Sequence, residues 1–312
     1  MTARRFLKML LIMALAALAI DLLIGFGAYR LMGTARSGDS QRAYHINKRT
    51  EADVLIFGSS RALHHYDPAV LEKHWGTTVY NAGNDGCGIL LNYMQLSSIL
   101  QRYTPKTVIM DLYGPYDFLR EADYSRYLGW ARIFYGKGCE ALDSVIDDAD
   151  PTERFKNLSG AYRYNYRIVQ VIFDNIASRT TDYHGYRGEE GELDPKAATD
   201  LTWPSTELDP LKLEYLRRLA ERCRERGVKL YVVVSPYYST FPSEQIPERV
   251  RSILATYGVE PIDMSRDPRF LGQHRYFYDT NHLNSRGACL FTGIVAEKID
   301  SLQKTENQRD KK

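Results

Sequence analysis

A serine and a histidine from opposite ends of the chain could together form an acyl-transfer site. The segment Val54–Arg61 reads VLIFGSSR, in which four apolar residues lead into Gly58 and two serines. This pattern predicts a buried strand that ends in a sharp turn and presents a hydroxyl group there. A serine becomes a nucleophile only when a base reaches it. An Asp-x-x-His run supplies a candidate base, and we expect Ser60, His282 and Asp279 to meet in space.

Strands that alternate with helices from Glu51 onward predict an α/β fold. Apolar runs predict five strands, at Asp53–Phe57, Thr77–Asn81, Thr107–Leu112, Lys229–Ser235 and Val259–Asp263. The intervening patterns predict a short helix after Asp67 and longer helices at Ile89–Gln101, Lys212–Arg226, Pro247–Tyr257 and Asn284–Leu302. Alternation with short connections implies a mostly parallel five-stranded sheet that is covered by helices on both faces.

The candidate chemical groups follow the C-terminal ends of the predicted strands. Ligands of open parallel sheets bind outside that edge. Ser60 follows the first strand, Gly83–Gly88 the second and Tyr113–Asp117 the third, whereas Asp279 and His282 lie beyond the fifth. The sequence therefore predicts a composite site at one rim of the sheet.

Three short blocks, in this order, resemble those of the SGNH (GDSL-type) hydrolases. The matching runs are Gly58-Ser59-Ser60, Asn81-Ala82-Gly83-Asn84-Asp85-Gly86 and Asp279-Thr280-Asn281-His282. The resemblance covers roughly residues 51–117 and 208–303, and it implies a flavodoxin-like three-layer fold. It also implies that Ser60 is the nucleophile, His282 its base and Asp279 the group that orients the imidazole.

The family resemblance further implies an oxyanion hole, in which the backbone N–H groups of Ser60 and Gly86 face the developing charge. The third family block normally reads Gly-x-Asn-Asp, and its asparagine is another donor. Here the matching run is Gly114-Pro115-Tyr116-Asp117, so a tyrosine replaces the asparagine. Either Tyr116 or Asn84 takes over that function, or the hole has fewer donors. Losing one donor typically reduces the rate by about 10²–10³-fold, so a non-catalytic relative is an open alternative.

The residues Phe6–Gly27 predict an N-terminal membrane anchor. Twenty-two helical residues span about 33 Å, which is enough to cross a bilayer. Asp21 opposes insertion by up to about 3.5 kcal/mol, but the twelve Leu, Ile and Phe residues each favour it by roughly 0.3–0.6 kcal/mol. We favour an uncleaved anchor over a cleaved signal peptide with Gly33-Thr34-Ala35 as its cleavage site. Basic residues before the apolar run would keep the N-terminus in the cytoplasm and place the rest outside, in the periplasm of a Gram-negative host.

The remaining segments complete the predicted organisation of the chain. Residues 34–50 are polar and lack periodicity, which predicts a linker, and we expect residues 304–312 to form a disordered tail. The long segment 118–206 should hold helices of its own, and residues 113–186 contain ten tyrosines. The insert is rich in aromatic and basic residues: Tyr124, Tyr127, Trp130, Tyr162, Tyr164, Tyr166, Tyr183, Tyr186, Arg126, Arg132, Arg163 and Arg167. They suit an anionic glycan, or the tyrosines simply pack the insert against the sheet.

Composition excludes several classes of protein. A net charge of +2 in 312 residues does not indicate a nucleic-acid-binding protein. The four cysteines lack metal-binding spacing, so we expect no metal and no cofactor. Cys223 shares a helical face with apolar residues, so we expect it in the core.

The motifs and the anchor together predict an extracytoplasmic acyl-ester hydrolase that acts on an O-acylated cell-envelope glycan. The layout also resembles membrane-tethered SGNH-like proteins of envelope acylation, which D-alanylate teichoic acids or O-acetylate exopolysaccharides. That likeness implies an alternative, an O-acyltransferase with a membrane acyl-donor partner. A carbohydrate-binding or scaffold protein without turnover is the third possibility.

Overall fold

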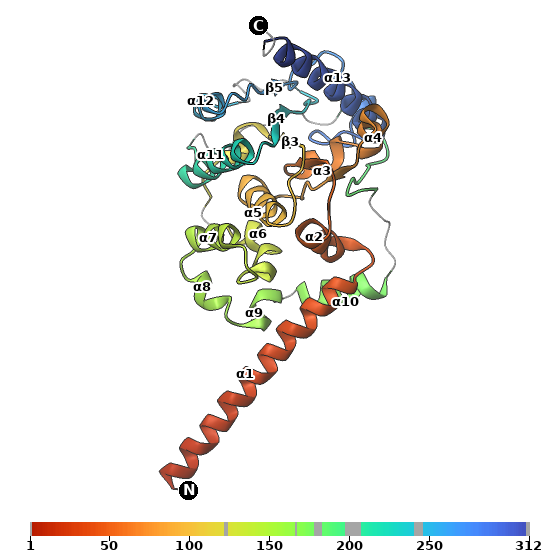
Figure 1. Cartoon of the computed structure of the whole chain (residues 1–312). Coiled ribbons are helices and arrows are strands. Elements are labelled where there is room, and N and C mark those ends of the chain that lie inside the picture. Colours follow the sequence, from red (N-terminus) through yellow and green to blue (C-terminus); the bar gives the residue numbers. More distant parts are fainter. Residues whose placement is uncertain are drawn as a thin grey trace. The chain divides into compact units, whose positions relative to one another are not determined.

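A five-stranded parallel sheet organises the residues that carry the candidate chemistry (Figure 1). Its strands run in the order β2-β1-β3-β4-β5, and every neighbouring pair is parallel. Their bounds are β1 Val54–Phe57, β2 Val79–Asn81, β3 Thr107–Asp111, β4 Lys229–Val234 and β5 Ile262–Asp263. Each strand lies within its predicted range, so the α/β class and the parallel sheet are confirmed.

This computed structural model describes residues 2–121, 124–165, 167–177, 183–196, 207–239 and 246–309. The chain divides into two units, each of two segments. The anchor unit comprises Met1–Arg49 and Leu128–Thr181, and the sheet unit comprises Thr50–Tyr127 and Asp182–Lys312. The insert expected over residues 118–206 thus supplies its middle part to the anchor unit.

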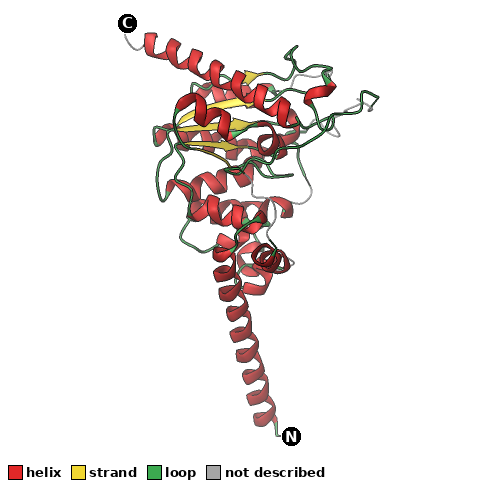
Figure 2. Ribbon diagram, turned by 90° about the vertical axis from the view of Figure 1, so that its right-hand side faces the viewer, coloured by secondary structure: helices red, strands yellow, loops and turns green. Residues whose placement is uncertain are grey.

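Helices cover both faces of the sheet (Figure 2). In the sheet unit they are α3 Ser60–His65, α4 Pro68–Trp75, α5 Ile89–Leu100, α11 Pro210–Glu225, α12 Glu248–Thr256 and α13 Ser285–Arg309. Residues of α3, α4 and α13 share a core cluster with Ile56, Ile109 and Val233 of the strands. Helix α5 is buried along its whole length and packs against α11, where Cys223 is buried as predicted.

The loop after β2 is tied to the helix that begins at Ser60. The buried Asn81 side chain donates to the carbonyl oxygens of Ala62 and Tyr66, at 2.7 and 2.9 Å. Its own oxygen accepts the N–H of Gly83 at 3.0 Å. A Cβ atom at Gly83 would lie 2.5 Å from Leu63 N, so the loop can approach this helix only with a glycine there.

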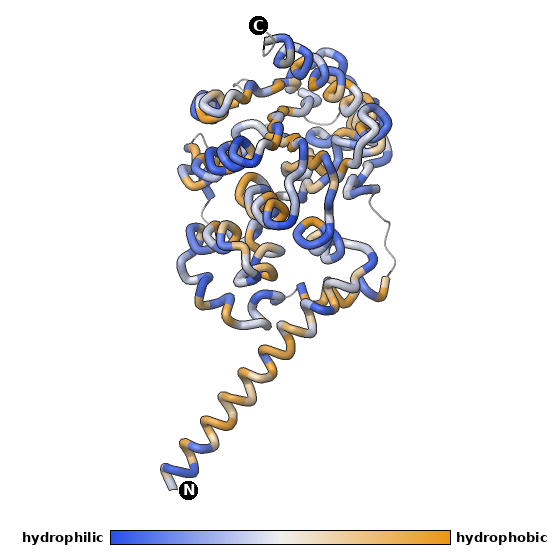
Figure 3. The backbone as a smooth tube through the Cα atoms, in the orientation of Figure 1, coloured by the Kyte–Doolittle hydropathy of each residue, from blue (hydrophilic) through white to orange (hydrophobic). Residues whose placement is uncertain are grey.

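The anchor unit is helical in its described part. Its elements are α1 Ala3–Thr34, α2 Gly38–Lys48, η2 Ala131–Phe134, α7 Glu140–Ala149, α8 Glu153–Lys156, α9 Gly160–Tyr164 and α10 Arg167–Ile176. The short helix α6, Ser125–Leu128, crosses the boundary between the units. Helices within the insert were expected, and those described confirm the prediction. Helix α1 is an apolar rod along most of its length (Figure 3), and it is long and apolar enough to cross a membrane.

The predicted linker over residues 34–50 contains a helix, Gly38–Lys48, which the lack of periodicity did not indicate. Helix α2 buries polar residues such as Ser40, Arg42 and Asn47 together with Ala43. Hydropathy does not mark such a face as a buried one. Its first turn is fixed by Asp174, whose carboxylate accepts the backbone N–H and the hydroxyl of Ser40.

The C-terminal segment is also more ordered than expected. Helix α13 continues through residues 304–309, which we expected to be disordered. The run after Leu302 lacks glycine and proline, which favours helix. An exposed ion pair of 2.8 Å joins Glu306 of this extension to Lys229 at the start of β4. Residues 310–312 lie outside the described residues.

We predict that replacing two glycines of the sheet unit by alanine changes the stability of the protein in opposite directions. Gly83→Ala should destabilise the protein by about 1–3 kcal/mol, because the added methyl group would be forced against α3. Gly293→Ala is the control in α13, where an added Cβ atom would have no neighbour within 4 Å. This change should stabilise the protein by about 0.5–1 kcal/mol. Thermal unfolding in detergent micelles measures both. Equal effects of the two changes would contradict the close contact.

Candidate active site

Ser60 and His282 meet at the carboxyl edge of the sheet. Ser60 is the first residue of α3, directly after the β1 turn, and its Oγ lies 2.8 Å from His282 Nε2. The two residues are 222 positions apart in the sequence. Ser60 is only partly buried, so its hydroxyl group combines contact with the base and access from solvent.

Asp279 holds the histidine in the tautomer that a base requires. Its carboxylate accepts a hydrogen bond from His282 Nδ1 at 2.9 Å. It also accepts the backbone N–H groups of Asn281 and His282, at 2.7 and 2.8 Å. Partial burial opposes ionisation, but the contacts with His282 outweigh it and lower the pKa of Asp279. With Nδ1 donating to an ionised carboxylate, Nε2 is left to accept the Ser60 proton.

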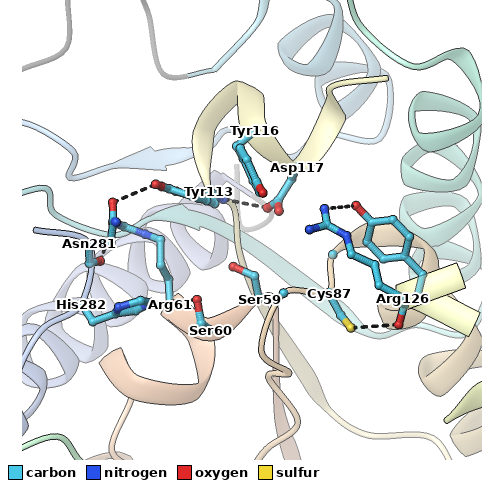
Figure 4. Close-up of a pocket in the computed structure, with 13 residues that line it drawn as sticks. Ser59, Ser60, Arg61, Cys87, Tyr113, Tyr116, Asp117, Arg126, Asn281 and His282 are labelled. Atoms are coloured by element: carbon cyan, nitrogen blue, oxygen red, sulfur yellow. Dashed lines mark hydrogen bonds between the residues drawn. The ribbon is translucent and has the colours of Figure 1, made fainter. Parts of the chain in front are cut away.

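A cavity of about 260 Å³ opens beside Ser60 (Figure 4). His282 lies at one side of it and Arg126 at the other. The lining residues are Ser59, Ser60, Arg61, Gly86, Cys87, Gly88, Tyr113, Tyr116, Asp117, Arg126, Tyr127, Asn281 and His282. The cavity is small for a ligand site, and its wall is aromatic and polar.

All three residues expected at the oxyanion hole, Ser60, Gly86 and Tyr116, line this cavity. Gly86 has a φ of +63°, a conformation that favours glycine. Asn84 is not among the lining residues, and its side-chain amide donates to the Ala82 carbonyl at 2.6 Å. Of the two replacements considered for the missing asparagine, Tyr116 is therefore the one at the cavity.

A buried arginine next to Ser60 joins the segment after β4 to the turn that carries His282. Arg61 donates to Ser235 Oγ, to the Pro236 carbonyl and to the Asn281 carbonyl, at 3.1, 2.8 and 3.0 Å. Its guanidinium lies 3.9 Å from the buried Asp111 carboxylate. Burial raises the pKa of Asp111 to about 6, although Arg61 opposes that rise. We did not predict this role from the sequence.

The fully buried His65 binds the backbone beside His282. Its Nε2 accepts the N–H of Leu283 at 3.0 Å, so its Nδ1 carries the proton and donates to Ser235 Oγ. Burial, with the positive charge of Arg61, lowers the pKa of His65 well below its usual value. The ring is therefore neutral, and it holds the residue that follows His282.

The ring of His64 packs edge to face against that of His282, with ring centroids 5.3 Å apart. Nδ1 of His64 lies 2.8 Å from the Arg187 carbonyl, and Nε2 lies 3.3 Å from Asp85. Burial disfavours the charged ring, but Asp85 and this carbonyl outweigh it and raise the pKa of His64. The sequence shows two consecutive histidines, His64 and His65, just after Ser60. We did not predict from this pair that either would lie beside His282.

Ser59 presents a second hydroxyl group to the cavity. Its side chain is buried, and no group in the described part of the chain hydrogen-bonds to its Oγ. A buried donor without a partner is costly, so this hydroxyl is available to a bound molecule.

The aromatic and basic residues of the insert divide into two groups. Arg126 and Tyr127 line the cavity. Contacts elsewhere account for most of the others: Tyr124 with Asp209, Arg132 and Tyr162 with Glu153, Arg163 with Tyr135, Arg167 with Trp130, and Tyr183 with Glu72. Tyr164 is buried and Tyr186 packs against the core cluster, whereas Tyr166 lies outside the described residues.

Comparison with models of known protein families finds no match, and comparison with curated proteins finds none either. The resemblance to SGNH hydrolases therefore rests on the short motifs of this chain.

We predict that the His64–Asp85 contact stabilises the protein in a pH-dependent way. Because the folded state raises the pKa of His64 above 6.5, the stabilisation should be full below that pH and be lost as the pH rises through the folded-state pKa. Asp85→Asn should therefore lower Tm more at about pH 5.5 than at about pH 9. An equal loss at both pH values would contradict the charged pair.

Proposed function

We propose that this chain is a membrane-anchored acyl-ester hydrolase with an SGNH-like fold and active site. The observation that carries the proposal is the 2.8 Å contact between Ser60 Oγ and His282 Nε2. Asp279 accepts a hydrogen bond from Nδ1, on the other side of the His282 imidazole. A hydroxyl, a base and an orienting carboxylate in this arrangement are the parts of a serine acyl-transfer site.

In the proposed reaction, Ser60 Oγ attacks the ester carbonyl carbon while His282 Nε2 takes the hydroxyl proton. Asp279 stabilises the imidazolium that forms. The tetrahedral intermediate collapses when His282 returns the proton to the leaving alcohol, which leaves an acyl group on Ser60. Water then attacks the acyl-enzyme by the same route and releases the free acid.

The oxyanion would be stabilised by the backbone N–H groups of Ser60 and Gly86. The phenol of Tyr116 would take the place of the family's asparagine, since Tyr116 lines the cavity and Asn84 does not. Ser59 Oγ would be a further hydrogen-bond donor to the bound ester. Donors of this kind are fixed before the reaction, which is why they favour the transition state.

The acyl group would be carried on a cell-envelope glycan and not on a long-chain lipid. The cavity holds about 260 Å³, and Tyr113, Tyr116, Tyr127 and Arg126 form much of its wall. Aromatic rings with polar edges suit sugar rings, and a guanidinium suits an acidic substituent. The anchor α1 would hold the catalytic unit on the extracytoplasmic side of the membrane.

We predict that Ser60→Ala and His282→Ala each reduce turnover of a small aryl ester by about 10⁴-fold or more. The double variant should lose little beyond either single variant, because the two residues act as a unit. Ser59→Ala is the matched control: it removes a neighbouring hydroxyl and should cost far less. An essential Ser59 beside a dispensable Ser60 would refute the assignment of the nucleophile.

The same assay separates the proposed activity from its alternatives. Acetylated oligosaccharides should be cleaved in preference to long-chain acyl esters, and the reverse order would exclude a glycan substrate. Acyl transfer to an added glycan would identify an O-acyltransferase. A folded wild-type protein without either activity would identify a binding or scaffold protein.

A further inference from the structure

Helix α10 exposes a stripe of large apolar side chains. Val169, Ile172, Phe173 and Ile176 recur at the spacing of one helical face, and their exposed fractions are 53%, 42%, 52% and 77%. Two further exposed apolar residues, Phe155 and Leu158, lie in and just after α8, with exposed fractions of 69% and 72%. We call these six residues the apolar platform. Exposed apolar residues gathered in this way mark an interaction surface.

The opposite face of α10 is fixed to the rest of the anchor unit. Asp174 accepts hydrogen bonds from the backbone N–H and the hydroxyl of Ser40, at 3.0 and 2.7 Å. Asn175 donates to the carbonyl oxygen of Leu31 in α1, at 3.0 Å, and Val171 is buried. Because these contacts set the rotation of α10, its apolar stripe cannot turn inward without breaking them.

The start of α9 is joined to α1 by an aspartate within the apolar helix. The Asp21 carboxylate accepts the Ser159 hydroxyl, the Gly160 N–H and the Ala161 N–H, at 2.6, 2.7 and 3.0 Å. At Gly25, a Cβ atom would lie only 2.8 Å from the Gly160 Cα. The first turn of α9 thus satisfies a carboxylate that would otherwise oppose the membrane insertion of α1.

The surroundings of α1 change within two turns after this junction. Large side chains are exposed from Phe6 to Phe26, whereas Ala28 and Met32 are buried. Leu158 of the platform directly precedes Ser159, which donates to Asp21, so this end of the platform lies beside the exposed apolar surface of α1. Basic side chains accompany it: Arg154, beside Phe155, and Arg30 of α1 are both exposed. Apolar residues bordered by cations suit the boundary between acyl chains and phosphate headgroups.

We infer that the apolar platform is a second membrane contact, which lies in the interfacial layer of the bilayer beside α1. The inference rests on the proposed anchoring of the chain by α1. The occupant is lipid, because one end of the platform lies beside the exposed apolar surface of that helix. Such a contact would fix the tilt of the anchor unit on the membrane, which a lone helix leaves free.

Nitroxide labels on the full-length chain in lipid nanodiscs test this inference. Cys87 and Cys289, the cysteines that are not buried, are first changed to serine. Single cysteines then replace Phe173 or Ile176 in the platform, Leu15 in α1, and Ser144 as an exposed control in α7. Collisions with oxygen, which concentrates in lipid, are compared with collisions with a water-soluble nickel chelate. We expect oxygen collisions to exceed nickel collisions several-fold at the platform and at Leu15, and the order to reverse at Ser144.

The labels distinguish failure of this inference from failure of the anchoring proposal. Nickel access at Leu15 would show that α1 is not in the membrane, and both proposals would fall. Lipid contact at Leu15 with nickel access at both platform positions would overturn only the second contact. Shielding of the platform from both reagents would also overturn it, since protein and not lipid would then cover these residues.

Discussion

The arrangement of the candidate site depends on one buried guanidinium. Arg61 follows Ser60 in the chain, and its hydrogen bonds reach the segment after β4 and the turn that carries His282. Removing one partner of a buried charged pair costs about 3–5 kcal/mol, so Arg61 and Asp111 constrain each other strongly. Arg61 therefore ties the helix that begins at Ser60 to the turn that carries His282.

A second set of contacts limits how His282 can move. His65 accepts the N–H of the residue after His282, and Asp279 accepts the N–H and the ring proton of His282 itself. Tyr113 adds a hydrogen bond of 2.8 Å to the Asn281 side chain. In the proposed reaction, a histidine held on several sides would need little reorganisation when it takes the Ser60 proton.

Local patterns were enough to predict the sheet and the meeting of Ser60, His282 and Asp279, because each strand is a short apolar run and each motif stands at a strand end. They were not enough for Arg61 and His65, whose partners lie roughly 170–220 residues away in sequence. Helix α2 was missed for a related reason: its buried face is polar, and Asp174, 134 residues further along, fixes its first turn. In the sequence alone, Asp21 argues against a membrane-spanning helix. In the folded chain, its carboxylate binds the start of α9.

The most direct test of the central claim is covalent labelling by a fluorophosphonate, which reacts with activated serines. We expect one adduct per chain, located by peptide mass spectrometry on Ser60, and lost in both Ser60→Ala and His282→Ala. An adduct on Ser59, or unchanged labelling after the loss of His282, would contradict the account in which His282 activates Ser60.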